Sequence, residues 1–146
     1  NMKRKTILLT ISTIILFVAI ILCIRIPYKE VNITDDLQTI QKQNTCISVH
    51  SLYKDKDWDM MVVVKPYNSI TATNESIDMG YGGDRDVIID NTMYDNMCTL
   101  LFVRGKKLVA FTSVYRSIID FSQLGKDVYK ADESIRIMNK IAGDCQ

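Results

Sequence analysis

The chain has 146 residues, with 18 basic and 17 acidic side chains and a formal net charge of +1. Residues 1–25 hold four of the 18 basic residues and no acidic one, which leaves 14 basic against 17 acidic residues, a net charge of −3, for the rest. A nucleic-acid-binding domain needs a concentrated basic face that displaces counterions from phosphates, so this balance excludes that class of partner. A hydrophobic fraction of 47% argues against a disordered chain.

The first predicted element is an apolar run at residues 7–24, ILLTISTIILFVAIILCI, in which only Thr10, Ser12 and Thr13 are polar. A helix needs about 20 apolar residues to cross a bilayer core of about 30 Å. A buried helix of a globular domain would instead show a polar stripe at a period of 3.6 residues. We therefore expect a transmembrane helix, with residues 1–26 as cytoplasmic stub and anchor and the lipid bilayer as a partner.

The length of this run and the residues at its ends predict whether it is cleaved and how it is oriented in the membrane. It exceeds the 7 to 15 apolar residues of a signal peptide and has no Ala-x-Ala site, which favours an uncleaved anchor. Attachment of lipid to Cys23 needs a small preceding residue, but Leu22 stands there, so a non-standard lipoprotein is the alternative. The basic residues 3–5 should stay in the cytoplasm and place the rest of the chain outside, although Arg25 and Lys29 act against that direction.

A short tether is expected after the anchor, followed by one domain. Pro27 opens residues 27–34, PYKEVNIT, and would end a helix because proline lacks a backbone donor. Asp35 and Gln38 resemble a capping pair, which predicts a brief helix over residues 35–43. Residues 35–146 then suffice for one hydrophobic core but not for two.

Apolar runs rich in β-formers predict the strands of this domain. Residues 45–53, TCISVHSLY, indicate a first strand, and the β-branched run 60–64 indicates a buried strand that ends before Pro66. Residues 68–83 are polar and end in glycines, and they could form either a helix or a long loop.

The clearest local unit is a hairpin. Residues 97–103 and 108–114 are apolar on both faces and flank Arg-Gly-Lys-Lys, in which the glycine suits a turn with positive φ. Apolar side chains on both faces indicate central strands of a sheet. The alternation over residues 134–139 indicates an edge strand. The predicted class is α+β, with four or five mainly antiparallel strands and one or two helices after the transmembrane helix.

Three short motifs lie within about residues 57–122. They are Trp58-Asp59 with Pro66-Tyr67, then Leu100-Leu101-Phe102-Val103, and then Asp120-Phe121-Ser122 with Arg116 ahead of it. In these motifs the chain resembles a family of short, membrane-anchored, uncharacterised proteins of Gram-positive bacteria. The resemblance implies an anchored small domain and implies no activity and no catalytic residue. Many members have a longer region after Pro-Tyr, where this chain has the glycine-rich residues 79–83.

The cysteines allow one disulfide within the domain. An extracytoplasmic domain can hold a disulfide, and Cys46 and Cys98 both lie on predicted strands, so we expect this pair and leave Cys145 unpaired near the chain end. The alternative is that all cysteines stay reduced. A cysteine nucleophile would need a nearby base, and the single histidine, His50, is expected to be a half-exposed strand residue.

No motif predicts a catalytic residue, a metal site or a cofactor. Zinc would need closely spaced Cys or His residues. Asp55, Asp57 and Asp59 alternate like the start of a calcium loop, but Met60 stands where such a loop needs glycine. The glycines at residues 80–83 lack the lysine of a phosphate loop.

Trp58 and Tyr67 are candidates for a surface contact, although aromatic residues beside a β-branched run are more often packed in a core. The preferred hypothesis is a membrane-tethered extracytoplasmic interaction module, accessory, inhibitory or immunity-like, that binds another membrane or envelope protein and is not an enzyme. The alternatives are a small envelope enzyme that uses carboxylates such as Asp84, Asp86 and Asp120, or a lipoprotein that binds an envelope ligand.

Overall fold

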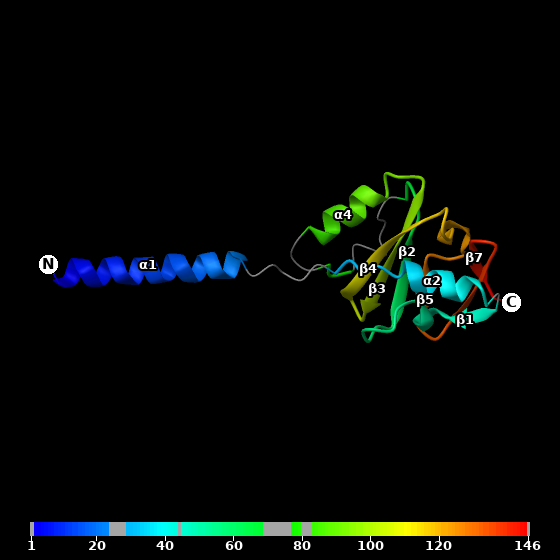
Figure 1. Ribbon diagram of the computed structural model, residues 1–146, viewed down its shortest axis with the longest axis horizontal. Helices are drawn as coiled ribbons and strands as arrows, with labels where there is room; N and C mark the ends of the chain where they lie inside the picture. Colours follow the sequence, from blue (N-terminus) through cyan, green and yellow to red (C-terminus); the bar gives the residue numbers. More distant parts are fainter. Residues whose placement is uncertain (1, 24–28, 44, 69–76, 80–82, 146) are drawn as a thin grey trace.

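The computed structural model describes residues 2–23, 29–43, 45–68, 77–79 and 83–145. They form an N-terminal helix, α1 (Met2–Cys23), and an α+β domain with two antiparallel sheets (Figure 1). The predicted α+β class is therefore confirmed. After α1 come α2 (Thr34–Gln41), β1 (Cys46–Ser48), the 3-10 helix η1 (Val49–Leu52), β2 (Met60–Val64), α4 (Asp84–Asn91), β3 (Met97–Arg104), β4 (Lys107–Tyr115), the 3-10 helix η2 (Phe121–Gln123), β5 (Val128–Lys130), β6 (Ser134–Met138) and β7 (Ile141–Asp144).

The predicted transmembrane anchor over residues 7–24 is corrected by the structure. Among the described residues, no helix has both the length and the apolar character to cross a membrane. The described side chains of α1, at positions 6, 7 and 10–20, are exposed and include three polar ones in its middle, Thr10, Ser12 and Thr13. Residues 24–28, which include Arg25 and Pro27, lie outside the described residues.

The larger sheet has the strand order β4-β3-β2-β5, with all pairs antiparallel. Strand β2 has the predicted bounds, and the β3–β4 hairpin turns at Gly105, whose φ is 61°. Leu100 and Phe102 of β3 enter one hydrophobic cluster, whereas Leu101 and Val103 enter the other, so both faces are buried. The central position predicted for the hairpin is thus correct for β3 and wrong for β4, which lies at the edge.

The edge of β4 is covered by two segments of the same chain. Val31 N donates to Phe111 O over 2.8 Å, and Phe111 N donates to Lys29 O over 2.9 Å. Closer to the hairpin turn, Asp78 makes a second, isolated parallel bridge to Lys107. These bridges occupy backbone groups that would otherwise present an edge for pairing with another chain.

The smaller sheet has the order β1-β6-β7. Residues 134–139 were predicted to form an edge strand, but β6 is central because β1 and β7 pair with its two sides. The strand predicted over residues 45–53 is only the three residues of β1, after which the chain turns into η1. Four to five strands were predicted in one sheet, whereas the described residues form seven strands in two sheets.

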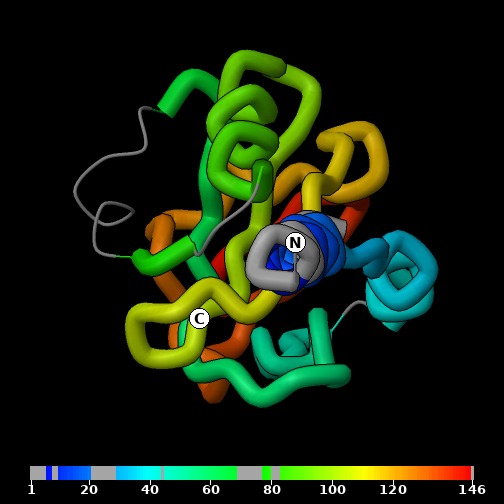
Figure 2. The backbone as a smooth tube through the Cα atoms, turned by 90° about the vertical axis from the view of Figure 1, so that its left-hand side faces the viewer, coloured from blue at the N-terminus to red at the C-terminus, as the bar shows by residue number. Residues whose placement is uncertain are grey.

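Helices α2 and α4 pack on opposite faces of the larger sheet. Figure 2, a view along α1, shows the two helices apart from each other. Leu37 of α2 joins the cluster between the two sheets, and Ile88 of α4 joins the cluster on the opposite face. The helix predicted over residues 35–43 is confirmed as α2, but the predicted capping pair is wrong. The residue before the helix is Ile33, which provides no side-chain cap.

Candidate functional site

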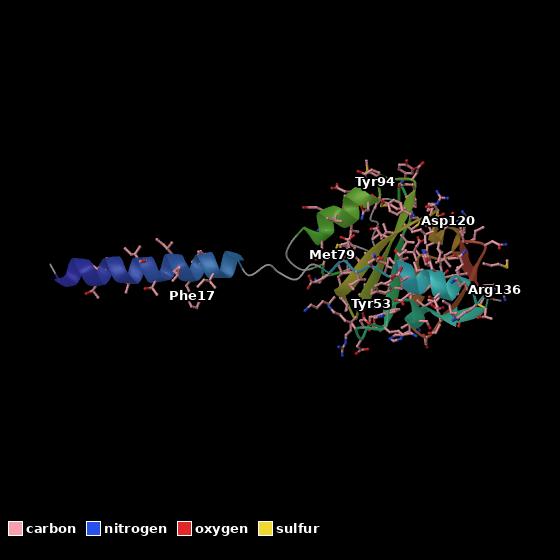
Figure 3. The ribbon with its side chains drawn as sticks, viewed as in Figure 1. Phe17, Tyr53, Met79, Tyr94, Asp120 and Arg136 are labelled. Atoms are coloured by element: carbon pink, nitrogen blue, oxygen red, sulfur yellow. A yellow bond between two sulfur atoms is a disulfide. The ribbon has the colours of Figure 1, made fainter. Side chains whose placement is uncertain are left out.

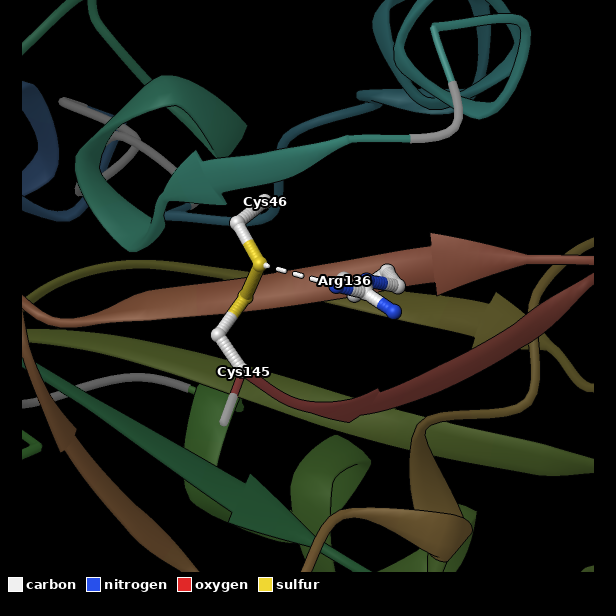
Figure 4. Close-up of a disulfide and its surroundings, with 3 residues drawn as sticks. All are labelled: Cys46, Arg136 and Cys145. Carbon is white, nitrogen blue, oxygen red and sulfur yellow. Dashed lines mark hydrogen bonds between the residues drawn. A yellow bond between two sulfur atoms is a disulfide. The ribbon is translucent and has the colours of Figure 1, made fainter.

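The disulfide joins Cys46 to Cys145, so the predicted pair of Cys46 with Cys98 is wrong. The two Cα atoms are 6.1 Å apart although the residues are 99 positions apart in the sequence. Strands β1 and β7 flank β6, and this topology brings Cys46 and the residue after β7 together (Figure 4). Arg136 of the intervening strand points its Nη2 toward Cys46 Sγ at 3.8 Å. The disulfide therefore fastens the two outer strands of the smaller sheet.

Cys98 is the cysteine left as a free thiol within the described domain, and it lies in β3 with 1% of its surface exposed. Burial, and then the negative charge of Asp120, raise the pKa of its thiol to about 11. The thiolate is the reactive form of cysteine, so this side chain remains an inert part of the core at neutral pH.

Trp58 is buried, with 3% of its surface exposed, so its proposed role as a surface contact is wrong. Its Nε1 donates to Tyr53 O over 2.7 Å, which satisfies the indole N–H inside the core. Its ring packs 4.9 Å from Phe102 and stacks on His50 at 5.2 Å between centroids. Trp58 is therefore packed in the core, which was the alternative that the sequence left open. His50 lies in η1 and not in the predicted strand.

The carboxylates considered for catalysis lie in separate places. Asp84 and Asp86 are in the first turn of α4, whereas Asp120 precedes η2 and pairs with β7 through an isolated bridge. Asp59 accepts from Gly105 N in the β3–β4 turn, and Asp57 forms an ion pair with Arg104 at 3.3 Å. Within the described part of the chain, no three acidic, cysteine or histidine side chains could together hold a metal ion.

The Asp120 carboxylate accepts hydrogen bonds from its neighbours, which occupy both of its oxygens. Nε and Nη2 of Arg116 donate to its two carboxylate oxygens at 3.0 Å each, and the Ser122 hydroxyl and N–H donate to Oδ1. Burial raises the pKa of Asp120, but these hydrogen bonds outweigh it and hold the pKa at about 2. The cluster fixes the corner between β4 and η2.

Two hollows lie on the surface of the described domain. One, of about 310 Å³, lies between α2 and η1 and includes Asp36 and Asp55 among its lining. The other, of about 440 Å³, lies along the β6–β7 hairpin. Asp144 at its edge already accepts from the Tyr129 hydroxyl and from Gly125 N.

Tyr67 is the second residue proposed for a surface contact, and 68% of its surface is exposed. Its φ is 56°, in the left-handed region where a bulky residue is rare and glycine or asparagine is favoured. Its N–H donates to Thr92 O over 2.8 Å, which places it beside the segment after α4. Neither packing nor backbone preference therefore accounts for a tyrosine here.

Further exposed apolar side chains gather at this end of the larger sheet. Met93 and Tyr94 follow α4 and are 69% and 55% exposed, and Tyr115 ends β4 and is 50% exposed. Tyr115 pairs with Met97 at the start of β3, three residues after Tyr94. Figure 3 shows Tyr94 at the rim of the domain, far from Arg136. We call Tyr67, Met93, Tyr94 and Tyr115 the tyrosine surface.

The sequence indicated one member of this surface, Tyr67, and missed the other three. The adjacent pair Met93-Tyr94, with polar neighbours on both sides, was the available signal, but its exposure depends on where α4 ends. Tyr115 was hidden at the end of an apolar run whose other residues are mostly buried.

Comparisons with known proteins found no match for this chain. No protein-family model matches the chain, and neither the curated proteins nor the solved structures include a match to it. The resemblance to membrane-anchored proteins of Gram-positive bacteria therefore stays a prediction.

Proposed function

We propose that the domain is a non-enzymatic interaction module that acts outside the cytoplasm and binds another protein of the cell envelope through the tyrosine surface. Its role would be accessory, inhibitory or immunity-like, that is, exerted by occupying a partner's surface. The observation that carries the proposal is the exposure of Tyr67, Met93, Tyr94 and Tyr115 at one end of the larger sheet.

The residue types of this surface fit a protein contact. Tyrosine and methionine are enriched in interfaces, where a tyrosine ring supplies apolar area and its hydroxyl a hydrogen bond. Tyrosine is also frequent among the residues that dominate binding free energy. An exposed cluster of this kind on a small domain is typical of a binding surface, whereas single exposed apolar residues need no explanation.

Tyr67 gives this proposal independent support. A non-glycine residue with a φ of 56° costs on the order of 1 kcal/mol or more. Such backbone strain is concentrated at functional sites because a folded domain keeps it only when its surroundings hold it in place. The strained backbone presents a tyrosine ring to solvent, which serves binding and not folding.

The Cys46–Cys145 disulfide supports the proposed compartment. Disulfides persist in oxidising surroundings such as the cell surface and are rare in the reducing cytoplasm. The proposal needs no transmembrane anchor, because docking on an envelope protein would itself retain the domain there.

Cross-linking of the full-length protein in native cells, followed by purification, tests the proposal. We expect one envelope protein to co-purify with the wild type and to be lost with a Tyr94→Ala/Tyr115→Ala variant. A matched variant, Lys130→Ala/Arg136→Ala, changes two exposed side chains elsewhere and should retain the partner. If the tyrosine variant captures the same protein as the wild type, the tyrosine surface is not the contact.

A further inference from the structure

The exposed charges around the tyrosine surface are mainly acidic. Asp86 and Asp90 lie on α4, and Asp95 follows Tyr94 directly, and all three are exposed. Asp90 is close to Met93 because Met93 N donates to Asp90 O over 3.0 Å in the last turn after the helix. Arg85, in the first turn of α4, is the exposed basic residue on the same helix. The exposed charge of residues 85–95 is therefore net −2.

Two basic side chains that are close in sequence to members of this surface are already paired. Arg116, next to Tyr115, is held by Asp120 and donates Nη1 to Asp95 O. Lys65, two residues before Tyr67, forms an ion pair with Asp127 at 3.0 Å and donates to Leu124 O. Asp120 and Asp127 largely compensate these two charges, and Arg116 interacts more weakly with Asp95 as well. Asp86 and Asp90 have no such basic neighbour among these two.

We propose that the partner of this surface presents lysine or arginine side chains around an apolar contact. This inference rests on the proposed function and specifies the chemistry of the partner. Apolar contact with the tyrosines would supply the affinity, and the aspartates would guide the encounter and reject acidic surfaces. Protein interfaces usually have an apolar centre and a polar or charged rim, and the two parts serve these two roles.

The same charges argue against other occupants. A second copy that met this surface face to face would bring two acidic rims together, and like charges across an interface are unfavourable. An anionic lipid surface would be repelled in the same way, and the stretch after α4 has no basic cluster to hold it. A basic protein surface is the occupant that the charges favour.

Two synthetic peptides test the inference. Each has the same central Leu-Tyr-Leu-Met segment, flanked by four lysines in one and by four glutamates in the other. Binding to the full-length protein is measured by fluorescence polarisation at low and high salt. We expect the lysine peptide to bind about tenfold more tightly than the glutamate peptide, with a difference that shrinks as salt rises.

Variants separate the charge effect from the proposed function. Asp86→Asn/Asp90→Asn/Asp95→Asn should remove most of the preference, whereas Asp35→Asn/Asp55→Asn/Asp132→Asn changes the net charge equally at exposed sites on other elements and should keep it. Equal binding of the two peptides, no binding of either, or equal loss in both triple variants would overturn the basic-partner inference. Tyr94→Ala should weaken binding of both peptides, and an unchanged affinity in that variant would count against the tyrosine surface itself.

Discussion

At the scale of single residues, Trp58 is a core residue whose loss should be costly. Its indole is buried, donates to Tyr53 O and packs against Phe102 and His50. Trp58→Ala should lower the free energy of unfolding by about 3–5 kcal/mol, and Trp58→Phe should cost less because most of the apolar volume remains. Urea unfolding followed by circular dichroism measures both. A red-shifted, readily quenched tryptophan emission in the folded protein would contradict burial.

Substitution of Tyr67, unlike that of Trp58, should not lower the stability of the domain. Asparagine adopts a φ near 56° more readily than tyrosine, and the lost side chain is 68% exposed. Tyr67→Asn should leave the free energy of unfolding unchanged or raise it by up to about 1 kcal/mol, while partner binding weakens. Thermal unfolding together with the co-purification assay tests this separation. A clear loss of stability would show that the ring packs in the domain.

Asp120 should make stability depend on pH in the acid range. Its pKa is about 2 in the folded protein, below the 3.8 of an ordinary aspartate. A lowered pKa stabilises the fold above the unfolded value, so this contribution is complete above about pH 4 and is lost as pH falls toward about 2.

Asp120→Asn should therefore cost about 2 kcal/mol at pH 6 and distinctly less at pH 2.5, as measured by urea unfolding at both values. Asp127→Asn is the matched control, because its ion pair with Lys65 is half-exposed and should contribute less than about 1 kcal/mol. A penalty for Asp120→Asn that does not change with pH would mean that the Arg116 contact does not depend on the carboxylate charge.

At the scale of elements, a strong local signal in the sequence made an element predictable. Strand β2 and the β3–β4 hairpin were predictable because long apolar runs and a glycine turn specify them without distant partners. The smaller sheet was not, since β1 and β6 are short and pair across about 90 residues of sequence, as between Cys46 and Arg136. Helix α4 has no clear amphipathic period, and its cover over the sheet follows from tertiary packing.

The disulfide acts on the smaller sheet. Joining Cys46 to Cys145 links residues that are 99 positions apart in the sequence. In the chain-entropy description, such a link lowers the entropy of the unfolded chain and so stabilises the folded state by several kcal/mol. Cys46→Ser/Cys145→Ser should lower the free energy of unfolding by about 2–5 kcal/mol. Cys98→Ala is the control, because it removes a buried thiol without cutting the bridge, and reductant should destabilise this variant as it does the wild type. Wild-type stability that is indifferent to reductant would contradict the bridge.

At the scale of the whole molecule, sequence reasoning could specify the class of the fold but not its surface. The pairing of Cys46 with Cys145 requires knowing that β1 and β7 flank one strand, and the tyrosine surface requires knowing that β2, α4 and β4 end near one another. Both facts are consequences of tertiary topology. The membrane span predicted over residues 7–24 was wrong as well, since no helix among the described residues combines the length and the apolar character that a span needs.

The most direct test of the central claim is photo-cross-linking from defined positions in living cells. A photoreactive phenylalanine analogue replaces Tyr94 or Tyr115 in the tyrosine surface, or Arg136 at a distant exposed position of the domain. We predict a cross-link to one envelope protein from the two tyrosine positions and none from position 136. Cross-links from position 136 alone, or the same partner from all three positions, would contradict docking through the tyrosine surface.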